Sequence, residues 1–264
     1  MQRRQFLAAS LATSAAAFMD DATAQKSTAR SREFYLIRRY QLQSGPQTKL
    51  TESYFRDALI PALNRMGMNP IGAFALKFGP ETPRYYLLIP SHSVETLATL
   101  DLHLAQDAEF MEHAAPFWNA SATAPAFQRI ESSLLAAFEG WPKITPPEAS
   151  GERSKRIYQL RTYESASDQD HVRKVEMFHS GEFEVFVKAG AQPVFFGDSL
   201  IGPRLPNLTY MLSFASMEDL DKSWDAFGAD PAWKKLSASP RFSFEQIVSN
   251  ISNQILTPLA ASQI

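Results

Sequence analysis

The chain of 264 residues contains no cysteine. That absence excludes disulfide bonds, thiol catalysis, zinc–thiolate sites and iron–sulfur clusters. The chain also lacks a large excess of either charge, since its formal net charge is −2, so nothing in it indicates nucleic-acid binding. No apolar run reaches the roughly 18 residues that indicate a membrane-spanning helix, so we expect no transmembrane segment in the mature protein.

Motifs of several large enzyme classes are missing as well. The sequence has no nucleophile elbow, phosphate loop or dinucleotide fingerprint. Its five histidines, at positions 92, 103, 113, 171 and 179, form no H-x-x-x-H pair. His171 and His179 share one predicted helix but lie about 12 Å apart along it, too far to bind one metal ion. We therefore expect no metal site and no cofactor.

The first 24 residues have the features of an export signal. Arg3 and Arg4 precede an apolar stretch at 7–18, and the Ala-Thr-Ala at 22–24 matches the small-x-small cleavage pattern. The paired arginines favour the twin-arginine route, with a Sec signal or an uncleaved anchor as the alternative. We expect a mature chain that begins at Gln25 and lies in the periplasm or outside the cell.

The rest of the chain contains two copies of one pattern. Residues 35–40 match residues 158–163, at an offset of 158 − 35 = 123, and Gly67 matches Gly190 at the same offset. Near the end of each copy Phe127 aligns with Phe244, at 244 − 127 = 117, which indicates six residues lost from the second copy. The proline-rich residues 142–154 predict a linker. The expected domains are therefore 32–141 and 155–264.

Both copies predict the element order β-α-β-β-α-β. Strands are expected at 34–41, 71–78, 84–89 and 127–137, and again at 157–164, 194–201, 208–214 and 243–251. Gly67 and Gly190 are expected to end the first helix of each copy, and Pro61 to kink or break it. Predicted helix N-caps are Ser93, Ser216, Asp107 and Asp230.

The fold class that follows is α+β. Each copy forms a ferredoxin-like sheet of four antiparallel strands with helices on one face. The other face is left bare and must be covered. We expect the two tandem domains to pack sheet to sheet as an intrachain pseudo-dimeric α/β barrel.

Several segments resemble the NIPSNAP family of proteins. They are residues 157–163, Gly190, residues 196–203 and the Asp-Pro-Ala-Trp at 230–233. The first copy is more divergent, with Ala-Glu-Phe at 108–110. The resemblance covers nearly all of the mature chain and implies the dimeric α/β-barrel fold, without catalytic residues to carry over. That superfamily includes cofactor-free monooxygenases, isomerases and haem peroxidases, and extending their activities to this chain is analogy.

The first strand of each copy carries the candidate ligand-binding residues, which are Arg38, Tyr40, Arg161 and Tyr163. They alternate with Ile37 and Leu160, so period two places them on one face of the strand. We expect Ile37 and Leu160 to pack against helices and the four polar residues to face the partner sheet.

Two interpretations of these arginines are open. They recognise an anionic or phenolic ligand, because a guanidinium offers a fork of donors. Alternatively, each pairs with a carboxylate across the domain interface, with Glu95 and Glu218 as candidates. The second interpretation is favoured, because buried charges are normally paired.

No reactive constellation emerges from the sequence, so whether the protein is an enzyme stays open. The expected function is small-molecule binding or protein interaction, with a small molecule as the possible partner and no nucleic acid. The alternative is a cofactor-independent monooxygenase or isomerase that acts on a small aromatic or lipophilic compound. A haem protein is the third and least favoured hypothesis.

Replacing both signal arginines, Arg3→Lys with Arg4→Lys, is expected to retain the precursor inside the cell, because the twin-arginine route reads that pair. Immunoblots of cytoplasmic and exported fractions measure the outcome. Normal export of the double variant would exclude this route.

Overall fold

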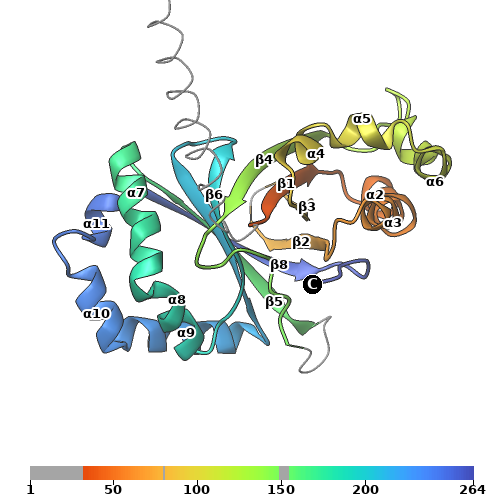
Figure 1. Ribbon diagram of the computed structural model, residues 1–264. Coiled ribbons are helices and arrows are strands. Elements are labelled where there is room, and N and C mark those ends of the chain that lie inside the picture. The colour runs from red at the N-terminus through yellow and green to blue at the C-terminus, as the bar shows by residue number, and fades with distance from the viewer. Residues whose placement is uncertain (1–31, 80, 149–154) are drawn as a thin grey trace, which may run out of the picture. The chain divides into compact units, whose positions relative to one another are not determined.

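Eight antiparallel strands close into one barrel in the computed structural model, which describes residues 32–79, 81–148 and 155–264 (Figure 1). The strand order around the barrel is β1-β3-β2-β8-β5-β7-β6-β4. The first copy contributes β1 (Phe34–Gln41), β2 (Gly72–Phe78), β3 (Arg84–Ser91) and β4 (Arg129–Ala137). The second contributes β5 (Ile157–Glu164), β6 (Gln192–Ile201), β7 (Asn207–Phe214) and β8 (Asn250–Pro258). The predicted export signal lies outside the described residues and stays a prediction.

Helices cover the outer face of each copy's own sheet (Figure 1). The first copy has α2 (Pro46–Tyr54), the π-helical segment η1 (Phe55–Leu59), α3 (Ile60–Arg65), α4 (Val94–Ala98), α5 (Leu100–Leu104) and α6 (Ala108–Trp118). The second has α7 (Asp168–Met177), the π-helical segment η3 (Phe178–Glu182), α8 (Phe183–Lys188), α9 (Met217–Ala229), α10 (Pro231–Ser237) and α11 (Phe244–Ile247). In the described part of the chain, none of these helices has the length and apolar character needed to cross a membrane.

Local signals in the sequence fix several helix ends as predicted. Gly67 and Gly190 have φ angles of 79° and 91°, the left-handed conformation that glycine adopts without steric cost. The four predicted N-caps each accept a hydrogen bond from a backbone N–H of the following turn; they are Ser93, Asp107, Ser216 and Asp230. These caps set where the outer helices begin above each sheet.

Closure of the barrel depends on two ladders between the copies. Within each copy the strand order is ferredoxin-like, β4-β1-β3-β2 and β8-β5-β7-β6. Strand β2 then pairs with β8, and β4 pairs with β6, so that Leu76 lies opposite Leu256 and Ala136 opposite Asp198. Each sheet edge therefore ends on the other copy, which removes the exposed edges that invite aggregation. The predicted pseudo-dimeric α/β barrel is confirmed.

Apolar side chains from both copies fill the barrel interior. The buried members are Tyr35, Ile37, Phe74, Leu76, Tyr86, Leu88, Leu135, Ala137, Ile144, Tyr158, Leu160, Val194, Phe195, Met211, Leu256 and Ile264. A separate apolar layer lies between each sheet and its helices, with Tyr40 in the layer of the first copy and Tyr163 in that of the second. Both faces of each sheet are thus buried.

The direction predicted for the first strand of each copy is wrong. Ile37 and Leu160 point into the barrel, where the two sheets meet. The four polar residues, Arg38, Tyr40, Arg161 and Tyr163, lie on the opposite, helix-facing side. The period of two was right and its phase was not. Alternation distinguishes a core face from a solvent face, whereas here one core lies above the strand and another below it.

The last strand of the second copy also differs from its prediction. The short helix α11 occupies four of the nine residues at 243–251 expected as strand, and β8 begins only at Asn250. Tyr40 pairs with Ile130 and Tyr163 pairs with Ile251, which gives an offset of 251 − 130 = 121. Relative to 123, the second copy loses two residues before this strand and not six. The match of Phe127 to Phe244 placed the gap wrongly, because Phe127 lies in the loop before β4 whereas Phe244 is the first residue of α11.

Both copies contain a π-helical segment at the same place in the first helix. The segments η1 and η3 begin at Phe55 and Phe178, and 178 − 55 = 123. A break near Pro61 was predicted, and Pro61 indeed lies in the first turn of α3, where its missing N–H costs little. The second copy has its π-helical segment without a proline and with a kink at Gly181, whose φ is 126°, so a proline is not required for this segment. Such turns realign the side chains of the helix that follows.

The start of the predicted linker is attached to the barrel. The backbone N–H of Glu33 donates to Pro142, and the carboxylate of Glu33 accepts from the N–H of Ile144. The N–H of Thr145 donates to Val194 of β6. Ile144 is buried among the residues of the barrel interior. The connection therefore adds the side chain of Ile144 to the barrel core and also links the two copies.

Truncating Leu256 tests the shared interior. Leu256 is fully buried and pairs across both β5 and β2, so Leu256→Ala is expected to lower the free energy of unfolding by about 2–5 kcal/mol. Leu102 is 67% exposed, and Leu102→Ala should change that free energy by no more than about 0.5 kcal/mol. Urea unfolding followed by fluorescence measures both. Equal effects of the two substitutions would contradict a common barrel core.

Candidate functional site

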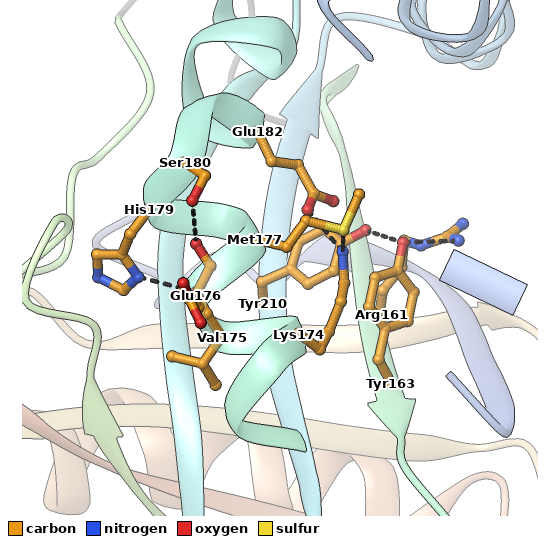
Figure 2. A network of polar contacts seen from close by, with 10 residues as sticks. All are labelled: Arg161, Tyr163, Lys174, Val175, Glu176, Met177, His179, Ser180, Glu182 and Tyr210. Atoms are coloured by element: carbon orange, nitrogen blue, oxygen red, sulfur yellow. Dashed lines mark hydrogen bonds and ion pairs between the residues drawn. The ribbon is translucent and has the colours of Figure 1, made fainter. Parts of the chain in front are cut away.

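A buried ion pair lies between the sheet and the first helix of the second copy (Figure 2). Lys174 on α7 donates to Glu182 at the end of η3 over 2.5 Å, and their side chains are 0% and 1% exposed. Lysine and glutamate are almost never fully buried unless they are paired. The π turn between them brings two residues eight positions apart into direct contact. This pair is the centre of the candidate site.

Aromatic rings surround the ammonium group of Lys174. Its Nζ atom lies 4.3 Å from the ring centroid of Phe178, 4.9 Å from Phe244, 5.2 Å from Tyr163 and 5.9 Å from Trp233. Such distances allow cation–π attraction, which is strongest where water is excluded. The ion pair is therefore held in an aromatic cage built from β5, η3, α10 and α11.

Two of the predicted residues belong to the same cluster. The hydroxyl groups of Tyr163 and Tyr210 are hydrogen-bonded over 2.8 Å, and Arg161 donates to the hydroxyl of Tyr163 over 3.2 Å (Figure 2). The guanidinium of Arg161 also lies 4.4 Å from the ring centroid of Trp224. Arg161 is therefore stabilised by a hydroxyl group and an indole face. Glu218, one of the two carboxylates suggested as arginine partners, instead pairs with Lys222 on the exposed side of α9.

Burial changes the titration of this cluster. Desolvation lowers the pKa of Lys174 and raises the pKa of Glu182, and the attraction between the two groups opposes both shifts. Burial also raises the pKa of Tyr163 and of Tyr210, so both phenols stay protonated at neutral pH. The cluster thus offers two neutral hydroxyl groups beside a lysine and a glutamate, the two groups whose charges burial opposes.

The first copy places different residues on the same framework. The arginine equivalent to Arg161 is Arg38, which donates to Asp101 over 2.8 Å. Asp101 is the counterpart of Trp224, since 224 − 123 = 101. The carboxylate partner of Arg38 is therefore Asp101 of its own domain, so the expected pairing across the domain interface was wrong for this arginine. Arginine is kept in both copies, whereas the group that compensates its charge differs.

The ion pair itself is confined to the second copy. The counterparts of Lys174, Glu182 and Tyr210 at the offset of 123 are Thr51, Leu59 and Leu87. All three counterparts are 0% exposed, so they occupy the same buried place beneath the first helix. The helix–sheet packing of this repeat therefore forms without an ion pair.

The cover over the ion pair comes from two short helices. Helix α10 contributes no buried residue, and α11 has only four residues, of which Ile247 is buried. These two helices lie at the outer edge of the helices that cover the sheet of the second copy (Figure 1), and they supply Trp233 and Phe244 to the cage. The segment from α10 to α11 packs on α7 through the buried side chains of Met177, Phe242 and Ile247.

The histidines stand apart from this cluster. His179 points away from Lys174 on the same helix (Figure 2), where its Nδ1 atom donates to the carbonyl of Val175 and its Nε2 atom accepts from Gly140. His171 contacts Asp198 over 2.7 Å. The two histidines therefore contact different residues and do not contact each other.

Sequence reasoning found part of the site and missed the rest. It singled out Arg161 and Tyr163 and did not place Lys174, Tyr210 or Trp224 beside them. Glu182 falls at the helical spacing of the apolar residues Phe178 and Val185, as one charge within that stripe. The charge in the stripe was the usable signal, because a glutamate on a core face requires a nearby cation. The position of Lys174 could not be inferred without the π turn.

Comparison with known proteins supports the fold and identifies the family. The NIPSNAP family model matches residues 35–139 and again residues 158–263. The chain belongs to the NIPSNAP family. Its two matches correspond to the two copies described above, so this NIPSNAP protein carries its domains in tandem. A search of curated proteins found no match.

Solved structures with a similar fold come from several bacteria. A protein from Fusobacterium nucleatum, provisionally named a monooxygenase, is 8% identical with a TM-score of 0.56, covering 87% of this chain and 94% of that one. A protein from Lactobacillus acidophilus with the same provisional name is 12% identical with a TM-score of 0.53, covering 86% and 94%. A NIPSNAP-like domain protein from Burkholderia xenovorans is 16% identical with a TM-score of 0.36, covering 40% and 88%.

A double-mutant cycle tests the energetics of the ion pair. Lys174→Met leaves Glu182 buried without its cation, and it is expected to lower the free energy of unfolding by about 3–5 kcal/mol. Glu182→Leu leaves Lys174 buried without its anion and is expected to lower the free energy of unfolding by the same amount. The double variant removes both charges at similar volume and should be neutral or more stable by about 1–4 kcal/mol. Urea unfolding measures all three. Additive losses in the double variant would show that the two residues are not energetically coupled, which would contradict this account.

Proposed function

We propose that this NIPSNAP protein binds a small molecule, and that the ligand site is the cluster around Lys174 and Glu182 in the second copy. One observation carries the proposal. A fully buried ion pair lies in the second copy where the first copy has threonine and leucine on the same backbone. The first copy thereby serves as an internal reference for what the fold alone requires.

Folding energetics give little reason for such a pair. Removing two charges from water costs several kcal/mol per ion, and their attraction offsets this cost only in part. An apolar pair at the same place is commonly as stable, and Thr51 with Leu59 shows that the repeat folds with an uncharged pair there. Titratable groups with shifted pKa values gather at functional sites, although structural pairs shift as well. The comparison of the two copies favours a functional role here.

The chemistry of the cluster suggests the class of ligand. The cage consists of aromatic rings, which favour an aromatic compound. Arg161 and Lys174 favour an anionic or phenolic oxygen, and Tyr163 and Tyr210 can both donate and accept hydrogen bonds. Within the described residues, the Oε1 atom of Glu182 is buried without a hydrogen-bond partner and can accept one from a hydroxyl group. A small hydroxylated or carboxylated aromatic compound meets all these conditions.

Mass spectrometry of compounds that co-purify with the protein from its native cells tests the assignment. Wild-type protein is expected to retain a small aromatic compound, and Lys174→Met with Glu182→Leu to lose it. Lys222→Met with Glu218→Leu is the matched control, because it removes an exposed lysine–glutamate pair of the same domain. Equal retention by the two double variants would contradict the site, and an empty wild-type protein would contradict the function.

Export forms part of the proposed function. The paired arginines and the small-x-small motif before Gln25 support delivery of the mature protein to the periplasm or beyond. The absence of cysteine is compatible with an oxidising compartment, since the core needs no disulfide to be stable. A ligand met there would come from outside the cytoplasm.

A cofactor-independent monooxygenase or isomerase is the second candidate. The first observation in its favour is the provisional name of two proteins with this fold. The second is that burial lowers the pKa of Lys174 and raises the pKa of Glu182, so both values move towards neutral pH, where an acid and a base are most effective. The raised pKa values of Tyr163 and Tyr210 count against a tyrosinate base. Oxygen consumption with 1,4-dihydroxynaphthalene, faster for wild-type protein than for the Lys174→Met, Glu182→Leu variant, would support an oxygenase. Equal rates would speak against it.

A further inference from the structure

A second polar site lies at one end of the barrel, on the opposite face of the sheets from the Lys174 cluster. A small pocket is present there, with about 30 Å³ of space for the centres of water molecules, inside about 450 Å³ of empty space that includes open solvent. Its lining comes from both copies: Ile37, Arg39, Tyr86, Ser133, Leu160, Thr162, Ser199, Gly202, Pro203, Arg204, Asn207, Thr209 and Gln254. Ile37 and Leu160 belong to the apolar barrel core and form the deep end. The remaining residues are mostly polar.

The charge of this lining is of one sign. Arg39 and Arg204 are its charged members, and no carboxylate belongs to this set of described residues. Hydroxyl and amide groups provide further donors, from Ser133, Thr162 and Gln254 among others. Two guanidinium groups surrounded by neutral donors form an environment suited to an oxyanion.

Arg39 is incompletely compensated by the protein. Its side chain is 15% exposed, and its Nε atom lies 3.9 Å from Glu131, too far for a hydrogen bond. Glu131 is 45% exposed, so water and salt screen the pair. The Nη2 atom donates to Ser133 over 3.0 Å, whereas Nε is buried and has no hydrogen-bond partner in the described part of the chain. An unsatisfied buried donor on a cation is costly, and a bound anion would satisfy it.

Neighbouring charges add to this imbalance. Burial lowers the pKa of Arg39, and the like charges of Arg204 and Arg84 lower it further, against the opposing effect of Glu131. Arg84 and Arg204 each have a carboxylate partner, Glu81 and Glu164 respectively. Arg204 also donates to Ser252, and it lines the pocket from a strained turn, with a φ angle of 62° that is unusual for a residue other than glycine.

The repeat explains why one anion is expected and not two. Arg39 and Thr162 are equivalent positions, since 162 − 39 = 123, and so are Tyr86 and Thr209. All four line the same pocket, so the pseudo-twofold axis that relates the two copies passes through this pocket. A barrel of two identical domains would bring two Arg39-type residues together. In this chain threonine replaces one of them, which leaves a single principal cation.

We propose that this end of the barrel binds one small oxyanion, a carboxylate or phosphate group, between Arg39 and Arg204. Arg39 forms the inner contact through its Nε atom, and Arg204 closes the pocket from the turn. Ile37 and Leu160 limit the depth, so the charged group enters and the rest of the molecule stays near the opening. This site is separate from the ligand site of the proposed function and does not depend on it.

Isothermal titration of the full mature chain with sodium phosphate and with sodium benzoate, at constant ionic strength, tests the site. At least one of these anions is expected to bind with one site per chain. Arg39→Gln and Arg204→Gln should each weaken that binding by about tenfold or more, the effect of losing a charged hydrogen bond. Arg204 is 43% exposed, so its variant preserves the fold even if Arg39→Gln does not.

Two controls separate the outcomes. Arg241→Gln removes an exposed arginine that pairs with Glu176 elsewhere, and it should bind as the wild type does. The Lys174→Met, Glu182→Leu variant should also retain the anion, which distinguishes this site from the helix–sheet cluster. Unchanged affinity in Arg204→Gln and in a folded Arg39→Gln, or no binding of either anion to the wild type, would overturn the proposal.

Discussion

Two hydrogen-bonded ladders, β2 with β8 and β4 with β6, join the copies and thereby determine what each face of each sheet can do. Once the sheets close on one another, their inner faces become a common apolar core, and their outer faces become the floor of two separate helix–sheet layers. The candidate residues Arg38, Tyr40, Arg161 and Tyr163 lie in those layers because the inner face is occupied by residues such as Tyr35 and Tyr158. The barrel end is polar because the ladders stop there and water can enter.

The fold followed from local patterns that do not depend on distant partners. Glycines with positive φ, serine and aspartate caps, and strand-length apolar runs set the element order in both copies. The phase of the strands did not follow, because burial on both faces removes the contrast between polar and apolar sides on which such an assignment depends. The last strand was shifted, because alignment by aromatic residues cannot detect the short helix α11.

The site was predictable only in the part that lies on one strand. Arg161 and Tyr163 are two positions apart, so period two relates them directly. Lys174 reaches Glu182 through a π turn, Tyr210 comes from another strand and Trp224 from another helix, and these relations are tertiary. The glutamate on an apolar stripe was the one local sign that the layer holds a charge.

The chain carries on one polypeptide what two separate domains would otherwise form by association. Two free domains would close the barrel only above a concentration set by their dissociation constant, and their apparent stability would fall on dilution. Here the connection through Pro142 and Thr145 holds the partner sheet at a high effective concentration. Unfolding is then a unimolecular event whose midpoint is independent of how much protein is present. Each copy can also change its sequence without the same change appearing in its partner, so a substitution tolerated in only one half of the barrel remains accessible.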